Sequence, residues 1–247
     1  MKVLSARPLA DSAVTLVLAE AAGPEAASRV GTALAAIRDA ILNGAVPGAS
    51  EVAASFVSLT VHYDPLISSQ ADLMDRITAI LDPLQPGKTA AGRQWRLPCC
   101  YDASCGIDLS DLSDHLGLEV QDIVARHAAI RFDVYAIGFL PGLPFMGELP
   151  PELARPRRHE PRTHVPAGSV AIANRMGVIY PWVSPGGWHV VGACAVPLFD
   201  AARPVPALLA AGDCVQFDPG SLADHDALRR DLAAGRLDPM TFCDGGE

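Results

Sequence analysis

The chain has 247 residues, of which 50% are hydrophobic and 19% charged, and its formal net charge is −9. This length suits one large or two small domains, and an acidic chain is a poor match to nucleic acid, because phosphate binding needs a basic face. No window approaches the roughly 20 apolar residues that span a bilayer, and the first residues lack the apolar core of a signal peptide. We therefore expect a cytoplasmic protein with neither a membrane nor a nucleic-acid partner.

Residues 1–88 are expected to form a small α+β domain. A β-rich run at 13–18 is followed by Pro24, which suits the first turn of a helix, and apolar residues continue at helical spacing to Ile41. Alternation over 57–62 predicts a half-buried strand, and Ser69 begins a second helix. The order strand, helix, strand, helix favours a two-layer α/β sandwich, and the polar stretch 86–92 is the expected linker.

Residues 93–247 are expected to form a second domain that is mainly β. Residues 138–192 hold 8 glycines and 9 prolines, which exclude long helices there. Many short strands separated by such residues predict a small barrel or sandwich. The pattern predicts strands at 95–100, 131–137, 169–173, 178–182, 189–191, 195–199 and 213–217, a helical pair over about 109–128 capped between its members by Gly117, and a terminal helix at 224–234.

The six cysteines are scattered and form no C-x-x-C pair. We expect reduced, mostly buried thiols. Cys99 is a candidate nucleophile near a strand end, although a core thiol is the favoured interpretation. The sequence contains no H-E-x-x-H or paired-cysteine metal motif and no glycine-rich phosphate loop. No metal is expected, and any ATP is expected to bind on a partner.

Residues 138–166 form a long stretch with little helix or strand character. Seven prolines stiffen it and many of its residues are apolar, so we expect an ordered functional loop. Glycine-rich motifs at 138–147, 165–170 and 180–188 can bring backbone amides close to an oxyanion or carboxylate. For each motif alone, a tight turn at a barrel corner is the alternative. The substrate-binding candidates are Gly138, Phe139, Pro141, Gly142, Pro166, Gly168, Ser169, Tyr180, Ser184, Pro185, Gly186, Gly187 and Trp188.

A basic cluster interrupts the acidic chain at 154–164. It contains Arg155, Arg157, Arg158 and Arg162, and the planar guanidinium suits carboxylate and phosphate. A solvated face or a contact with a partner protein is the alternative. Arg162 is the preferred anion contact, because the nearby Val165 and Pro166 make it the arginine of the cluster that is expected to be least exposed.

His127 lies in phase with the apolar face of the second helix of the pair. A histidine there is a candidate general acid or base near neutral pH. A hydrogen-bonded core histidine is the alternative.

The motifs V-Y-A-I-G-F-L-P-G-L-P-F-M-G, P-R-R-H-E-P-R, V-P-A-G-S-V-A-I-A and Y-P-W-V-S-P-G-G-W, between residues 134 and 188, resemble those of the allophanate hydrolase subunit 1 family, which includes the B subunits of bacterial 5-oxoprolinases. The resemblance covers nearly the whole chain. It implies an amino-terminal α+β domain and a carboxy-terminal cyclophilin-like β-barrel. It also implies two partners, an allophanate hydrolase subunit 2 homologue and an ATP-using third protein, in a complex that opens 5-oxoproline to glutamate. In that complex His127 would move a proton and Arg162 would hold an anion of a small acidic or amide substrate.

The chain departs from the family pattern at residues 174–178. The family has a G-x-Q-T-G type turn there, whereas this chain has Asn174, Arg175, Met176, Gly177 and Val178. If the turn touches substrate, the specificity can differ. The altered turn supports one alternative function, a urea-carboxylase or allophanate-hydrolase type of module acting on another small amide. The resemblance leaves a second alternative open, an inhibitor of a sensor histidine kinase.

Overall fold

The computed structural model describes residues 1–84 and 92–244. The chain divides into two compact units, Met1–Ala91 and Gly92–Glu247, and each is described by itself. The linker predicted at 86–92 falls almost wholly outside the described residues and stays a prediction.

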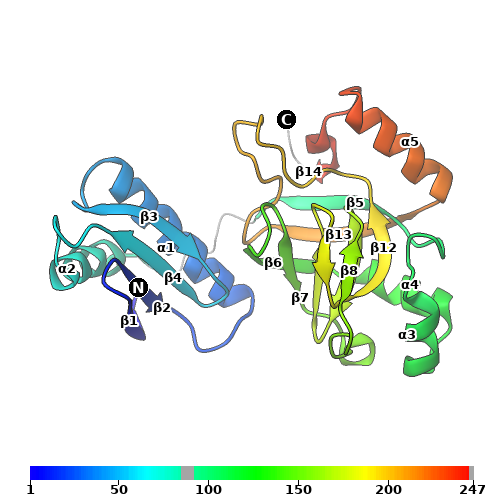
Figure 1. Ribbon diagram of the computed structural model, residues 1–247, viewed down its shortest axis with the longest axis horizontal. Coiled ribbons are helices and arrows are strands. Elements are labelled where there is room, and N and C mark those ends of the chain that lie inside the picture. Colours follow the sequence, from blue (N-terminus) through cyan, green and yellow to red (C-terminus); the bar gives the residue numbers. More distant parts are fainter. Residues whose placement is uncertain (85–91, 245–247) are drawn as a thin grey trace. The chain divides into compact units, whose positions relative to one another are not determined.

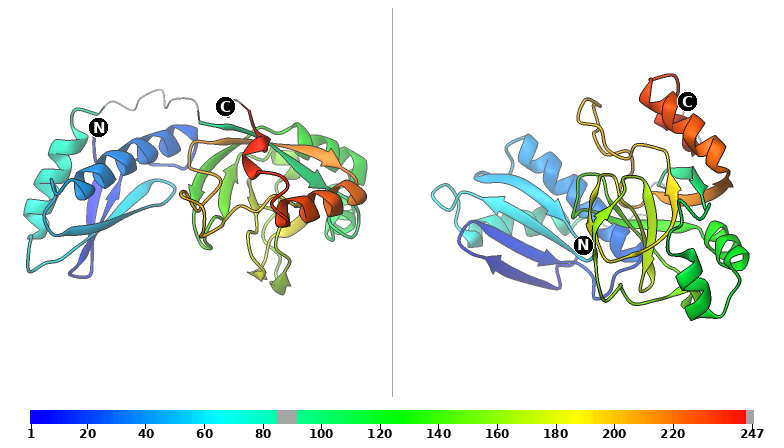
Figure 2. Two further views of the ribbon diagram at one scale, coloured as in Figure 1. Left: turned by 90° about the horizontal axis from the view of Figure 1, so that it is seen from above. Right: turned by 45° about the vertical axis from the view of Figure 1, so that its right-hand side comes forward.

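The first unit is a four-stranded antiparallel sheet with two helices packed on one of its faces (Figure 2). The strand order is β1-β2-β4-β3, so the two central strands are β2 and β4. A core of aliphatic side chains fills the space between the sheet and the helices. The elements are β1 (Ser5–Leu9), β2 (Ala13–Val17), α1 (Pro24–Leu42), β3 (Ala49–Ala54), β4 (Ser58–Tyr63) and α2 (Gln70–Leu81).

The helix starts in this unit follow from local chemistry. Pro24 occupies the first turn of α1, where its missing amide costs no hydrogen bond. The Ser69 hydroxyl accepts a hydrogen bond from the Asp72 amide at 3.1 Å and so caps α2. Both helices begin where the sequence predicts.

The prediction for this unit omits two strands, β1 and β3. Both are edge strands of the sheet, and most of their residues are exposed or only half buried. An edge strand with a largely exposed surface lacks the alternation of buried and half-buried residues that marks β4. The two-layer α/β sandwich is nevertheless confirmed.

The second unit is built on a closed barrel of seven strands (Figure 1). Its ring runs β12-β9-β10-β7-β6-β13-β5, and the pairing of β12 with β5 closes it. The short β14 adds to β5, and β8 pairs with β11 beside the barrel. This arrangement confirms the cyclophilin-like barrel. The strands are β5 (Gln94–Cys100), β6 (Phe132–Ile137), β7 (Pro144–Gly147), β8 (Arg162–Val165), β9 (Ser169–Ala173), β10 (Met176–Ile179), β11 (Ser184–Gly186), β12 (His189–Cys194), β13 (Cys214–Gly220) and β14 (Cys243–Asp244).

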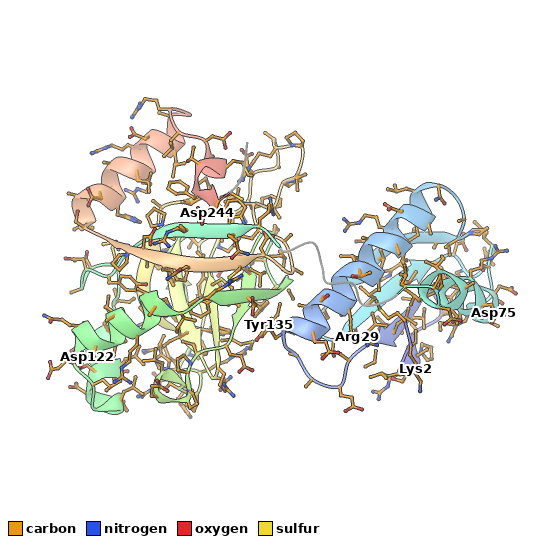
Figure 3. The ribbon with its side chains drawn as sticks, turned by 180° about the vertical axis from the view of Figure 1, so that it is seen from behind. Lys2, Arg29, Asp75, Asp122, Tyr135 and Asp244 are labelled. Carbon is orange, nitrogen blue, oxygen red and sulfur yellow. The ribbon has the colours of Figure 1, made fainter. Side chains whose placement is uncertain are left out.

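Three helices pack on the outside of this barrel: α3 (Leu109–Leu116), α4 (Val120–Ala129) and α5 (Leu222–Ala233). Gly117 ends α3 in the left-handed conformation, with φ of 64°, as predicted for the cap between the paired helices. Figure 3 shows Asp122, an exposed residue of α4, at the outer side of the barrel. A capping box between Ser221 and Asp224 starts α5.

The glycine- and proline-rich part contains more strand than predicted. Within 138–166 the structure has β7 and β8, so the expectation of one long irregular loop is wrong. The strand predicted at 195–199 is also wrong: this segment makes only the isolated bridge of Phe199 with Ala207, and Pro197 in its middle has no amide to donate.

No helix in residues 1–84 or 92–244 is long and apolar enough to cross a membrane. All six cysteines are free thiols, and five of them are buried, as predicted. Among the described residues no cluster of histidine, cysteine and acidic side chains could hold a metal ion.

Candidate functional site

The motifs at 138–147 and 180–188 meet at one pocket of about 130 Å³ on the barrel unit. Leu143 and Val178 are buried and give the pocket an apolar inner surface, while Phe139 is 75% exposed and stands at its opening. Phe139 has φ of 68°, which is uncommon for a bulky residue and a feature of functional sites. The lining consists of Phe139, Leu143, Phe145, Arg157, Val178, Tyr180, Pro185, Gly186, Gly187 and Trp188.

Close packing between Gly186 and Tyr180 shapes one wall. A Cβ atom on Gly186 would lie 2.4 Å from the Tyr180 hydroxyl, so any larger residue would displace the tyrosine. Tyr180 and Trp188 are almost fully buried, and Phe145 lies 6.1 Å from Trp188 between ring centroids. The aromatic wall is therefore preformed rather than assembled on binding.

Arg157 supplies the positive charge of the pocket. Its guanidinium carbon lies 5.5 Å from the centroid of the Trp188 ring, within the range of a cation–π contact. Among residues 1–84 and 92–244, no carboxylate pairs with it. Arg157 is thus a solvent-accessible cation that can pair with an anion in the pocket.

Arg162, the anion contact preferred from the sequence, is held differently. Its Nη1 and Nη2 atoms donate to the two carboxylate oxygens of Asp108 at 2.8 Å and 2.6 Å. Arg158 also donates to Asp108, at 2.9 Å. Arg162 does not line the pocket, and its charge already faces a buried carboxylate.

Two further hydrogen bonds hold the arginine segment, residues 154–164: one is made to the pocket lining and the other to β12. The Arg158 amide donates to the Gly187 carbonyl at 2.7 Å, and His189 Nε2 donates to the Pro156 carbonyl at 2.9 Å. Burial lowers the pKa of His189, with the nearby guanidinium of Arg155 acting in the same direction. A neutral His189 with its proton on Nε2 fits this bond.

A family model described as "Carboxyltransferase domain, subdomain C and D" matches residues 4–209. The chain belongs to this family. It is 43% identical over 123 residues to the 5-oxoprolinase B subunit of Escherichia coli O157:H7, covering 50% of this chain and 56% of the relative. It is 33% identical over 199 residues to the 5-oxoprolinase B subunit of Bacillus subtilis (strain 168), covering 75% of this chain and 81% of the relative. These matches confirm the resemblance predicted from the motifs.

The crystal structure of TTHA0988 has a similar fold, with a TM-score of 0.71 and 35% sequence identity. The match covers 85% of this carboxyltransferase-family chain but 40% of TTHA0988. The chain also spans little more than half the length of its E. coli relative. The equivalent fold in TTHA0988 is therefore part of a longer polypeptide.

The pocket brings together six of the predicted substrate-binding residues: Phe139, Tyr180, Pro185, Gly186, Gly187 and Trp188. The neighbouring Gly138, Pro141 and Gly142 form the turn that carries Phe139 but do not line the pocket. Ser184 is buried beside it, and its hydroxyl donates to the Pro185 carbonyl at 3.3 Å.

The motif at 165–170 contributes no lining residue to this pocket. Gly168 lines a second hollow of about 180 Å³, which shares only Tyr180 with the first. The Gly168 amide donates to the Tyr180 carbonyl at 2.7 Å and the Ser169 amide donates to the Pro166 carbonyl at 3.2 Å. These two amides already have acceptors, so the donor role predicted for them has no support in this geometry.

Four lining residues were not among the predicted substrate-binding residues: Leu143, Phe145, Arg157 and Val178. Leu143 and Phe145 belong to the first glycine motif, and Arg157 belongs to the basic cluster. Both signals were visible in the sequence. What the sequence could not show is which arginine faces the pocket and which faces Asp108.

His127 is buried between α4 and the strands β6 and β13, and it does not line the pocket. It is 1% exposed, its ring stacks on Phe217 at 5.2 Å, and its Nδ1 atom lies 2.8 Å from the Tyr101 hydroxyl. Burial lowers the pKa of His127 to about 4. The surroundings of His127 are therefore those of a hydrogen-bonded core histidine, and its proton-transfer role stays a prediction.

Cys99 is buried, and burial raises the pKa of its thiol well above the usual value. The reactive form of cysteine is the thiolate. The core interpretation of Cys99 therefore fits the structure better than a nucleophile does.

The altered turn at 174–178 reaches the pocket only through Val178. Arg175 instead pairs with Glu148 at 2.7 Å on the surface. Its guanidinium is therefore directed to a neighbouring side chain of the same unit rather than to the pocket.

Proposed function

We propose that this chain is the substrate-holding B subunit of an ATP-dependent complex that opens the ring amide of 5-oxoproline. Membership in the carboxyltransferase family and the two relatives named as B subunits of 5-oxoprolinase support this proposal. The observation that carries it is Arg157, a guanidinium without an acidic partner in the described chain, placed over Trp188 at a small apolar pocket.

The chemistry of the pocket matches a compact acid of this kind. A substrate with one carboxylate and a small ring needs a single cation and an apolar surface of limited size. Arg157 provides the cation, and Leu143 and Val178 provide the apolar surface. Charge-assisted hydrogen bonds from arginine to a carboxylate are among the stronger polar contacts.

The lining contains no group suited to move a proton near neutral pH. Its titratable side chains are Arg157 and Tyr180. Burial raises the pKa of Tyr180, although the guanidinium of Arg157 and the Trp188 backbone oppose this rise. We infer that this chain binds and orients the substrate, and that partner proteins supply ATP and the groups that act on the amide carbonyl.

Reconstitution tests the proposal. The chain, an allophanate hydrolase subunit 2 homologue and an ATP-using partner are purified, and release of glutamate from 5-oxo-L-proline with ATP is measured for all combinations. Turnover is expected only for the full set. An active set without this chain, or a full set that releases no glutamate, contradicts the proposal, and a parallel panel of small amides identifies a different substrate.

The variant Arg157→Ala tests the role of the pocket in that complex. Loss of one charged contact to the substrate is expected to raise KM about tenfold, with a smaller change in kcat. Arg155→Ala is the matched control, since Arg155 belongs to the same segment but does not line the pocket. Equal KM values for the Arg157→Ala complex and wild type would exclude Arg157 as the anion contact.

A further inference from the structure

Asp108 stands at the N-cap of α3, but its side chain does not cap the helix. Aspartate at this position usually accepts a hydrogen bond from an amide of the first turn. The side chain is 3% exposed and is directed instead to groups outside the helix. The Asp108 side chain therefore has a role other than capping α3.

Four donors surround the Asp108 carboxylate. Oδ1 accepts from Arg158 Nη1 at 2.9 Å and from Arg162 Nη2 at 2.6 Å. Oδ2 accepts from Arg162 Nη1 at 2.8 Å and from the Val190 amide at 2.7 Å. The Asp108 amide also donates to the Val190 carbonyl at 3.0 Å, so the carboxylate has a fixed position relative to β12.

Both arginines that bind Asp108 are also tied to the wall of the pocket. Arg158 donates its amide to the Gly187 carbonyl, and Arg162 pairs in register with Gly186 across β8 and β11. Gly186 and Gly187 line the pocket. The buried carboxylate of Asp108 is thus hydrogen-bonded to the arginine segment and to β12, and through the two arginines it is connected to Gly186 and Gly187.

Arg157 lies between two anchored neighbours. On one side the Pro156 carbonyl accepts the hydrogen bond from His189, and on the other Arg158 is held by Asp108 and Gly187. Side chains that act at a binding site are held in place by the groups around them. The backbone on both sides of Arg157 is fixed, so its side chain emerges beside Trp188.

We propose that Asp108 is the positioning residue for Arg157: through Arg158 and Arg162, its buried carboxylate holds the 156–162 segment so that the Arg157 guanidinium lies over Trp188. Within residues 1–84 and 92–244 no carboxylate pairs with Arg157, and the buried carboxylate of Asp108 is already shared by Arg158 and Arg162. The proposal rests on the proposed function only for the identity of the anion that Arg157 binds.

The first test is spectroscopic and needs no activity. The indole signals of Trp95, Trp182 and Trp188 are assigned in ¹⁵N spectra of the full chain with Trp→Phe variants. The Arg157→Ala variant then gives the position of the Trp188 signal when the guanidinium over its ring is absent. Asp108→Asn is expected to move the Trp188 signal toward its Arg157→Ala position and to leave Trp95 in place. An unmoved Trp188 signal in folded Asp108→Asn overturns the proposal.

Asp213→Asn is the matched control. Asp213 is also a buried carboxylate paired with an arginine, Arg93, at 2.8 Å, and it accepts from the Trp95 indole at 3.0 Å. Its replacement is expected to move the Trp95 signal and to leave Trp188 in place. If both variants moved both signals, a general loosening of the barrel would replace the proposed positioning.

The second test is kinetic and uses the reconstituted complex. Asp108→Asn is expected to raise KM for 5-oxo-L-proline about tenfold with kcat within about twofold of wild type, as for loss of substrate binding. In the Asp108→Asn background, Arg157→Ala is expected to raise KM little further, because both changes remove the same contact between Arg157 and the substrate. Full additivity of the two changes contradicts the proposal.

The two tests separate this inference from the proposed function. If the wild-type complex does not act on 5-oxoproline, that compound is excluded as the substrate. The indole signals still report whether Asp108 positions Arg157. If Asp108→Asn does not fold, Arg162→Lys keeps the charge and loses the two-pronged contact. It is expected to shift the Trp188 signal partway, and an unmoved signal in this variant also overturns the proposal.

Discussion

His127 lies in an apolar environment, and this placement couples its protonation to folding. Its pKa is lowered to about 4 in the folded chain by burial, against the ordinary value of 6.5. Between these two pH values the unfolded chain binds more protons, so stability is complete above about pH 6.5 and falls as the pH decreases toward 4. A shift of this size corresponds to about 3 kcal/mol.

His127→Asn is therefore expected to flatten the pH dependence of the free energy of unfolding between pH 6.5 and 4. Asparagine keeps a polar group near the Tyr101 hydroxyl but cannot be charged. Urea unfolding at several pH values measures the effect, and the exposed His159→Asn is the control. Parallel curves for wild type and His127→Asn would show that His127 does not titrate as its burial requires.

The same variant tests the predicted proton-transfer role in the reconstituted complex. A residue that transfers a proton in catalysis typically contributes a factor of about 100 or more to kcat. Because His127 does not line the pocket, we expect kcat of His127→Asn to stay within about tenfold of wild type. A loss of a hundredfold or more in a stable variant would restore the catalytic interpretation.

Of the two glycines that line the pocket, Gly186 has less space for a side chain. A Cβ atom there would meet the Tyr180 hydroxyl at 2.4 Å, whereas one at Gly187 would meet no heavy atom closer than 3.7 Å. Gly186→Ala is expected to displace Tyr180, raise KM about tenfold and cost about 1–3 kcal/mol of stability. Gly187→Ala should cost less stability, and equal unfolding midpoints for the two variants would contradict the close packing.

At the level of helices and strands, the sequence is most informative where buried side chains recur with a period. The stripe of α1 and the alternation in β4 predict both elements closely. The edge strands β1 and β3 lack such a pattern, because most of their residues face solvent or are half buried. Their identity as strands depends on pairing with a partner that lies elsewhere in the chain.

The pocket shows the same limit. Glycine and proline spacing indicated a binding site at 138–147 and 180–188, and residues of both segments line the pocket. Arg157, Arg158 and Arg162 lie close together in similar local sequence, so the sequence around them does not distinguish their roles. Only the position of Asp108, more than forty residues earlier, decides which of them is paired and which stays available. Such a long-range contact has no local signal.

The whole chain has two units, each with its own hydrophobic core. One cluster joins α1 and α2 to their sheet, and the barrel contains separate clusters of its own. A core that does not depend on the other unit suggests independent folding. Residues 92–247 expressed alone are therefore expected to give a folded barrel with a cooperative thermal transition and native near-UV circular dichroism.

The pocket and every residue that positions Arg157 belong to that second unit. A ligand that binds only the folded form stabilises it by about 2.7 kcal/mol at a hundred times its Kd. We expect 5-oxo-L-proline to raise the midpoint of the isolated 92–247 fragment and of the corresponding transition in the full chain, and to leave the transition of residues 1–91 unchanged. Differential scanning calorimetry with and without ligand measures both transitions, and Arg157→Ala should remove the shift. A ligand effect on the fragment 1–91, or a shift that persists in Arg157→Ala, would place the binding site elsewhere in the molecule.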